Sequence, residues 1–232
     1  AIETCLGTNP VDGLCSSSEY GSMPDWDVSL VTDMSGFDGT SFQGFGNKTT
    51  FNGDIGSWNT EKVTDMDSMF TSAYAFNQDI GNWNTAQVNS MNGMFWAAFA
   101  FNQDIGNWNT AQVNSMNGMF REASAFNQDI GSWNTAQVTY MDSMFRDASA
   151  FNQDISSWIG TAATTAQTNM FSGATAFQAK YTCGTTGPAS SCDTIESTWV
   201  APSPPPSPPP SVATPTGPLS SSVTTLTGIL GL

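Results

Sequence analysis

The chain has 232 residues, with 20 acidic side chains, 5 basic ones, no histidine and a formal net charge of −15. Such a charge repels nucleic-acid phosphates and anionic membranes, so neither is an expected partner. The lack of histidine excludes His-based catalytic triads and His-ligated zinc. No apolar run is long enough for a transmembrane helix. We expect no enzymatic activity, no membrane insertion and no required cofactor.

The four cysteines form two close pairs without a Cys-x-x-Cys spacing, and residues 1–25, which carry the first pair, match nothing later in the chain. We therefore predict an N-terminal disulfide cap over 1–25 and two local bridges, Cys5–Cys15 and Cys183–Cys192. Each bridge closes a loop of about ten residues and is worth about 2–3 kcal/mol. Disulfides, together with a first residue Ala1 in place of Met, favour a mature secreted protein.

A 25-residue repeat fills residues 26–177. A degenerate first coil starts near Trp26, and further copies open at Phe51, Phe76, Phe101, Phe126, Phe151 and, abortively, Phe177. A fixed period in this range indicates a solenoid of stacked units. The first coil is seven residues longer than the others, and the excess, near 36–48, should bulge as a loop. That loop carries a sequon, so Asn47 is a candidate for N-glycosylation.

Within one coil the apolar side chains run from Phe76 through Ile80, Trp83 and Val88 to Met91, Met94 and Phe95. The last part has the spacing of a helical or 3₁₀ turn, and the stretch from Ile80 to Trp83 is short and extended. We predict a repeat solenoid with short parallel β-strands, short helical or 3₁₀ turns, disulfide-capped ends and an extended C-terminal tail. Coils should lie about 4.8 Å apart where strands pair.

The composition changes after the repeats. We expect a C-terminal disulfide cap over 178–200, a proline-rich polyproline II linker over 201–211 and a Ser/Thr-rich assembly tail over 212–232. The candidates for hydroxylation or O-glycosylation are Ser203, Pro204, Pro205, Pro206, Ser207, Pro208, Pro209, Pro210 and Ser211. The apolar tail residues expected to contact a partner are Val223, Leu226, Ile229 and Leu230.

The repeat F-N-x-D-I-x-x-W-x-x-x-x-V-x-x-M-x-x-M-F-x-x-A resembles the BspA-like leucine-rich-repeat surface-protein family. The resemblance covers Trp26 to Phe177 and implies a curved, right-handed solenoid that is secreted or exposed on cell surfaces, with roles in adhesion and protein–protein contact. It places the strand near Gln78–Trp83 and the helical turn near Met91–Ala98. The Ser-Pro-Pro-Pro tract instead resembles the hydroxyproline-rich linkers of plant and algal extracellular-matrix proteins.

Two polar columns have alternative interpretations. The aspartates Asp54, Asp79, Asp104, Asp129 and Asp154 lie at the same place in successive coils, where they either cap turns or bind Ca²⁺. We favour turn capping, because the dense oxygen-ligand spacing of calcium repeats is missing. The threonines Thr60, Thr85, Thr110 and Thr135 form either a solvated strand edge, which we favour, or the flat rank of an ice-binding surface.

Some aromatic residues lie outside the repeated pattern. Tyr74, Trp96 and Phe99 should form one contiguous exposed patch, with Arg121 stacked on Trp96. The alternative is that neighbouring loops or the tail cover these rings. Tyr140 is a further candidate for a partner contact.

These features favour a non-enzymatic, secreted structural or assembly protein, a subunit of an extracellular filament, surface appendage or matrix. Its partners would be itself or other extracellular structural proteins. A cell-surface adhesion module that binds glycans or proteins is the alternative, and ice binding is a third.

Overall fold

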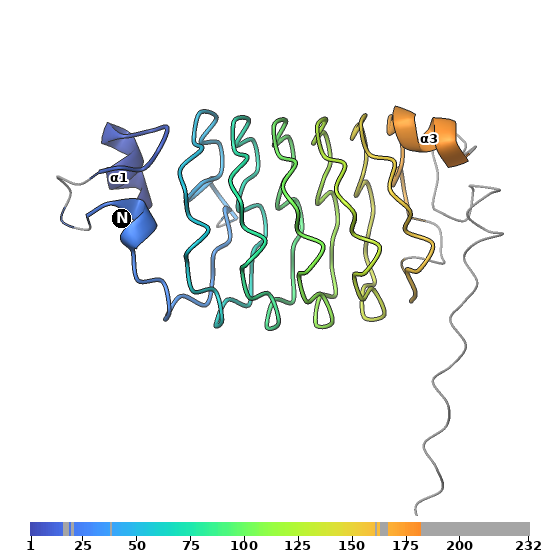
Figure 1. Ribbon diagram of the computed structural model, residues 1–232, viewed down its shortest axis with the longest axis horizontal. Helices are drawn as coiled ribbons and strands as arrows, with labels where there is room; N and C mark the ends of the chain where they lie inside the picture. The colour runs from blue at the N-terminus through green and yellow to red at the C-terminus, as the bar shows by residue number, and fades with distance from the viewer. Residues whose placement is uncertain (16–18, 20, 38, 161, 163–166, 182–232) are drawn as a thin grey trace, which may run out of the picture. The chain divides into compact units, whose positions relative to one another are not determined.

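The computed structural model describes residues 1–181 except 16–18, 20, 38, 161 and 163–166. Its repeats form coils that lie side by side in a stack, as the period predicted (Figure 1). The helices with described bounds lie near the ends of the stack: α1 (Ile2–Thr8), the 3₁₀ helix η1 (Met23–Asp25) and α3 (Thr175–Tyr181). The predicted second disulfide, Cys183–Cys192, and the tail predictions for residues 182–232 lie outside the described residues.

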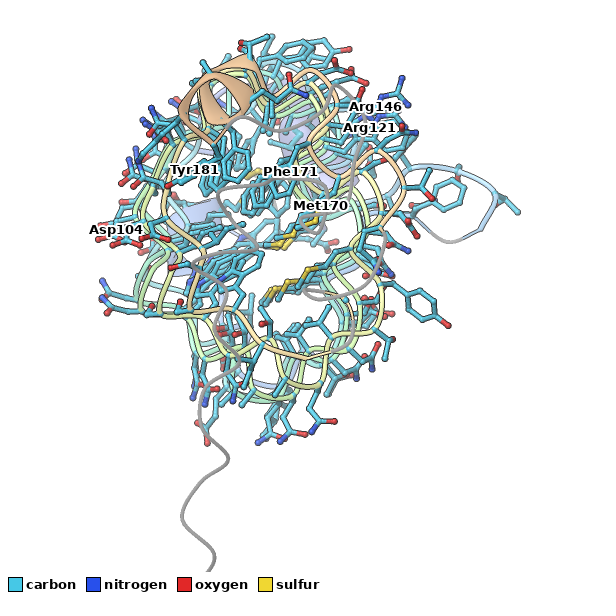
Figure 2. All side chains as sticks on the ribbon, turned by 90° about the vertical axis from the view of Figure 1, so that its right-hand side faces the viewer. Asp104, Arg121, Arg146, Met170, Phe171 and Tyr181 are labelled. Carbon is cyan, nitrogen blue, oxygen red and sulfur yellow. A yellow bond between two sulfur atoms is a disulfide. The ribbon has the colours of Figure 1, made fainter. Side chains whose placement is uncertain are left out.

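The core consists of columns of identical side chains, one per coil. The Phe that opens a coil stacks on the next such Phe at ring-centroid distances of 5.7–6.1 Å. Phe45 and the Phe of each later Met-Phe pair form a second column, with spacings of 5.5–5.8 Å. The columns also touch, for example Phe95 and Phe101 at 3.9 Å. Figure 2 looks along the stack and shows Met170 and Phe171 inside the ring of backbone.

Buried tryptophans form hydrogen bonds from each coil to the preceding one. The indole N–H of Trp108 donates to the carbonyl oxygen of Ile80 at 3.1 Å, and the tryptophans of the neighbouring coils repeat this bond. The ring of Trp108 also stacks on that of Trp133 at 6.4 Å. A buried Trp therefore supplies apolar area to the core and satisfies a carbonyl of its neighbour.

The predicted strand near Gln78–Trp83 is wrong. That segment bends, because Asp79 caps a turn at Gly81 and the N–H of Trp83 bonds back to Ile80. Within the described residues, parallel pairing occurs only as single bridges, in the column of Asp33, Asp65, Ser90, Ser115 and Tyr140.

The predicted helical turn near Met91–Ala98 is also wrong. The segment is a series of β-turns, in which Met94 bonds back to Met91 and Ala98 to Phe95. The third residue of each turn, Gly93 and Ala97, has a positive φ of 58° and 56°, the pattern of a type II turn. The intervening N–H groups, such as that of Phe95, donate to the next coil. A helix would have turned those groups inward along its own axis, so the turns allow coil-to-coil hydrogen bonding.

Both described ends carry covering elements. At the N-terminal end Cys5 and Cys15 form the predicted disulfide, and α1 buries Leu6. At the other end α3 stacks Phe177 on Phe151 at 5.7 Å, and the tilted ring of Tyr181 lies 4.5 Å from that of Phe177. The expected loop in the first coil is present, and Phe37 and Phe42 pair in it as an antiparallel bridge. In Figure 2 this pale blue loop projects to the right, out of the ring of backbone.

Candidate interaction surface

The aspartate column caps turns, as we favoured. The Oδ1 atom of each Asp accepts the N–H two residues later, at 2.9–3.0 Å, in all five coils. The carboxylates are exposed, and Figure 2 shows Asp104 at the outer edge of the stack. Where Ser156 replaces the usual Gly, its hydroxyl and N–H hold the pKa of Asp154 below its ordinary value. In the described part of the chain no group of three or more His, Cys, Asp or Glu residues could hold a metal ion.

The threonine column is buried, so the expectation of a solvated strand edge is wrong. Thr60, Thr85, Thr110 and Thr135 are at most 1 % exposed. Each hydroxyl donates to a carbonyl of the next coil, as Thr85 does to Asn109 at 3.1 Å. Because these side chains face inward, they do not form the flat, solvent-facing rank that ice binding would need.

Exposed aromatic side chains occur at sites where the coils differ. Tyr74 is 43 % exposed, and its ring stacks on that of Phe99, 41 % exposed, at 4.8 Å. The two following coils have Ser124 and Ser149 at the same place. Tyr74 and Phe99 thus form an exposed, stacked aromatic pair across two neighbouring coils.

Trp96 forms a second contact, with Arg121 of the next coil. The guanidinium carbon lies 4.5 Å from the centre of the Trp96 ring, as predicted, and Nε of Arg121 pairs with Glu122 at 3.2 Å. Arg146, one coil on, pairs likewise with Asp147. Among the described residues, no ring contact joins Trp96 to the Tyr74–Phe99 pair, and one contiguous patch of all three rings stays a prediction. Tyr140 is 57 % exposed.

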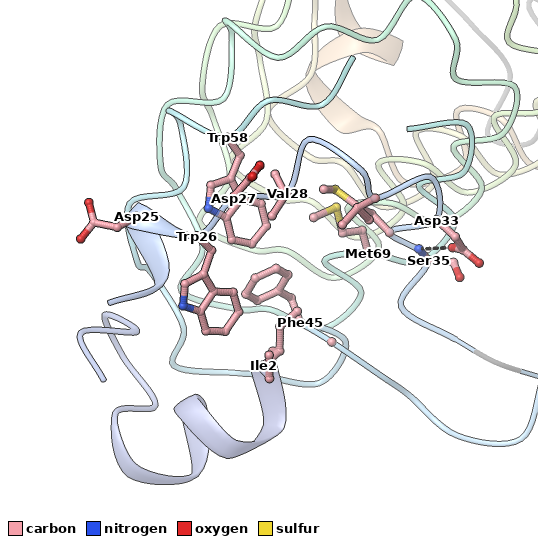
Figure 3. A pocket seen from close by; sticks show the side chains of 14 residues that line it. Ile2, Asp25, Trp26, Asp27, Val28, Asp33, Ser35, Phe45, Trp58 and Met69 are labelled. Atoms are coloured by element: carbon pink, nitrogen blue, oxygen red, sulfur yellow. Dashed lines mark hydrogen bonds between the residues drawn. The ribbon is translucent and has the colours of Figure 1, made fainter. Parts of the chain in front are cut away.

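Sequence reasoning missed a pocket beside the N-terminal cap (Figure 3). Its volume is about 480 Å³, and Trp26, Phe45, Trp58 and Met69 belong to its apolar wall. Three acidic residues, Asp25, Asp27 and Asp33, are also among its lining residues. The sequence did contain a signal for it: Gly44 precedes Phe45 where every later coil has a methionine.

Near this end, one aspartate has a raised pKa. Partial burial is the main cause for Asp65, and the neighbouring carboxylates of Asp67 and Asp33 add to it, although the N–H of Asp67 acts in the opposite direction. Later coils have Ser90, Ser115 and Tyr140 at this place. The charge of Asp65 therefore belongs to the first regular coil and not to the repeat.

The comparison with known families gives one match. A profile described as "Mycoplasma protein of unknown function, DUF285" matches residues 15–113 and again residues 88–183, more than half of the chain. The period of about 25 residues and its aromatic columns are consistent with the BspA-like repeat family. No curated protein and no solved structure matches the chain. None of the described helices has the length and apolar character needed to cross a membrane.

Proposed function

The chain belongs to the family described as Mycoplasma proteins of unknown function, DUF285, and from that premise we propose a non-enzymatic, secreted assembly protein. It would be a subunit of an extracellular filament, surface appendage or matrix, in contact with copies of itself or with other structural proteins. The repeated side chains are used to build coils, because they are buried or cap turns. Partner recognition therefore falls to residues that differ between coils.

The Tyr74–Phe99 pair is the observation that carries this proposal. Two large rings, each more than 40 % exposed, stand at a place where serine satisfies the fold in the next two coils. Exposed aromatic groups contribute strongly to protein–protein contacts once water is excluded from them. The fold does not require aromatic rings at this place, since Ser124 and Ser149 occupy it in the next two coils.

The test exchanges the pair for the serines that neighbouring coils already use. Tyr74→Ser with Phe99→Ser should fold normally and should lose the higher-mass species in sedimentation velocity. Ser124→Ala with Ser149→Ala is the matched control and should sediment like the wild type. A wild-type protein that is monomeric up to high concentration, or a double variant that assembles unchanged, would refute assembly through this pair.

Secretion has two supports. The Cys5–Cys15 bridge is of a kind that persists in oxidising compartments. Asn47 of the sequon is exposed in a turn with φ of 62°, a conformation that Asn tolerates, so an oligosaccharide could be attached without unfolding. Mass spectrometry of protein from its native source, before and after removal of N-glycans, would test occupancy of Asn47.

The proline-rich segment also belongs to this proposal. It resembles the linkers of plant and algal matrix proteins, so we expect hydroxylated prolines and glycosylated serines within 203–211. The apolar residues from Val223 to Leu230 would take part in the contact between subunits. Removal of residues 211–232 should then reduce the size of assemblies in light scattering, and an unchanged size would exclude the tail from assembly.

Adhesion to a glycan is the second candidate, because Arg121 over Trp96 combines an aromatic face with a cation beside it. Sugar rings stack their C–H faces on aromatic rings, and an acidic sugar would add an ion pair. Replacing Trp96 by the Arg of the next two coils should abolish glycan binding if this surface is used. A glycan array on the monomer, with and without that substitution, distinguishes adhesion from assembly.

A further inference from the structure

The N-terminal pocket exists because the column of buried methionines stops one coil early. A methionine precedes the Phe of each later Met-Phe pair, and these residues are Met69, Met94, Met119, Met144 and Met170. Gly44 stands at this place in the first coil, with φ of +59°, and a Cβ added to it would meet only the Cδ1 atom of Ile2, at 3.7 Å. The space that a methionine side chain would fill stays open beside Met69.

Aromatic rings form much of the wall. Trp26 and Trp58 lie nearly parallel, with centroids 6.4 Å apart, and Phe45 lies 5.8 Å from Trp58 (Figure 3). The indole N–H of Trp58 donates to Met23 and that of Trp26 to Gly21. Since both N–H groups are engaged, the rings offer a bound molecule their carbon surfaces and π-electrons.

The charge around the pocket is negative. Asp25, Asp27 and Asp33 are among its lining residues, and no Lys or Arg is found among the described residues that line it. The Oδ1 atoms of Asp27 and Asp33 accept the N–H of Ser29 and Ser35, at 3.0 and 2.8 Å. Hydrogen bonds from the hydroxyl and the N–H of Ser29 hold the pKa of Asp27 below its ordinary value, so this carboxyl is ionised at neutral pH.

We propose that this pocket binds a small organic cation, an ammonium group on an apolar body. The aromatic wall attracts a cation through its π-electrons, and the carboxylates add Coulomb attraction where an anion would be repelled. A volume of about 480 Å³ lies within the range of small-molecule sites. This site is independent of the aromatic pair proposed for assembly, because the two share no residue.

The test titrates the full chain with benzyltrimethylammonium and, separately, with neutral benzyl alcohol. Nuclear magnetic resonance signals of the indole N–H groups of Trp26 and Trp58 report binding. We expect saturable shifts with the cation and binding at least about tenfold weaker for the neutral probe. The absence of saturable shifts at both indoles, or equal affinity for the two probes, overturns the proposal.

Charge variants separate the site from the overall field of the molecule. The triple variant Asp25→Asn, Asp27→Asn and Asp33→Asn should weaken cation binding about tenfold. Asn can accept the same turn N–H groups, so the fold should persist, as unchanged indole spectra of the free protein would show. The control Asp79→Asn, Asp104→Asn and Asp129→Asn removes the same charge from the regular coils and should change affinity less than about twofold. An equal loss in both triple variants would show attraction by net charge alone and overturn the proposal.

Discussion

The Oδ1 atom of Asn77 accepts the backbone N–H of Asn102, one coil later, at 2.9 Å. The amide nitrogen of Gln103 also donates to Asn77, to its backbone oxygen at 2.9 Å and to its Oδ1 at 3.0 Å. The bond from N–H to Oδ1 recurs in each neighbouring pair of this column. Side chains thus supply the coil-to-coil hydrogen bonds on a face where no strand pairing occurs among the described residues.

Replacement of Asn77 by Ala should lower the free energy of unfolding by about 1–3 kcal/mol, because a half-buried N–H of the next coil loses its acceptor. Urea denaturation measures this. Asn82, exposed in the same coil, is the control, and Asn82→Ala should change stability by less than about 0.5 kcal/mol. Equal losses of stability from both substitutions would contradict a special role for the hydrogen bonds along the Asn column.

The buried threonines give a second prediction. Thr110→Val keeps the shape of the side chain but leaves the carbonyl of Asn134 without its donor at 3.0 Å, so we expect a loss of about 1–2 kcal/mol. Thr50→Val, at an exposed site, should be nearly neutral. Thermal unfolding of the two variants compares them, and a stable Thr110→Val protein would mean that the hydroxyl contributes little.

Asp65 predicts a pH dependence. Its pKa is raised in the folded state, so the folded protein holds this proton more tightly, and ionisation of Asp65 destabilises the fold as pH rises from the ordinary value of 3.8 through the raised one. Asp65→Asn can still accept the N–H of Asp67 and avoids that ionisation.

Above the raised pKa, Asp65→Asn should therefore be the more stable protein, by on the order of 0.5 kcal/mol after screening by solvent. The gain should disappear below the ordinary pKa, where the wild-type carboxyl is protonated in both states. Calorimetry from acid to neutral pH measures the difference. A gain that is independent of pH, or a loss at neutral pH, would contradict this assignment.

The aspartate column predicts a salt dependence. Asp104 lies between Asp79 and Asp129 in the stack, and Asp104→Asn removes two repulsions while an amide oxygen can still cap the turn. We expect the variant to be more stable by about 0.5–1 kcal/mol at low ionic strength, with most of the gain lost near 1 M salt.

If these carboxylates only cap turns, neither Ca²⁺ nor a chelator should move the midpoint of thermal unfolding of the wild type. Stabilisation by Ca²⁺ that disappears in Asp104→Asn would instead indicate a calcium ladder. The two outcomes are measured in the same thermal scans.

Periodicity was enough to predict the stack of coils and its apolar columns, since one face must be buried against each neighbour. Capping by Asp79 was likewise readable, because the acceptor and the N–H lie two residues apart. The burial of Thr85 could not be predicted from the sequence in this way. Its acceptor, the carbonyl of Asn109, belongs to the next coil, so the pattern of one coil shows a polar group without showing its partner.

The prediction of where the backbones of neighbouring coils pair was wrong for a related reason. The stretch around Ile80 looks extended in sequence, yet two turn-capping side chains, Asp79 and Asn84, close it from both sides. Pairing moves to Ser90, whose small polar side chain gave no strand signal. The N-terminal pocket was missed because it depends on what Gly44 lacks, and only an alignment of the coils against one another reveals that difference.

The hydrogen bonds between coils repeat at a separation close to 25 residues, so the two faces created by removing one whole copy would still fit each other. Near-identical copies in a gene recombine out of register, and each such event would lengthen or shorten this protein by one unit without leaving a mismatched joint. The number of copies between the N-terminal pocket and helix α3 therefore sets the separation of the two ends of the stack. The length of the solenoid can therefore change in steps of one coil.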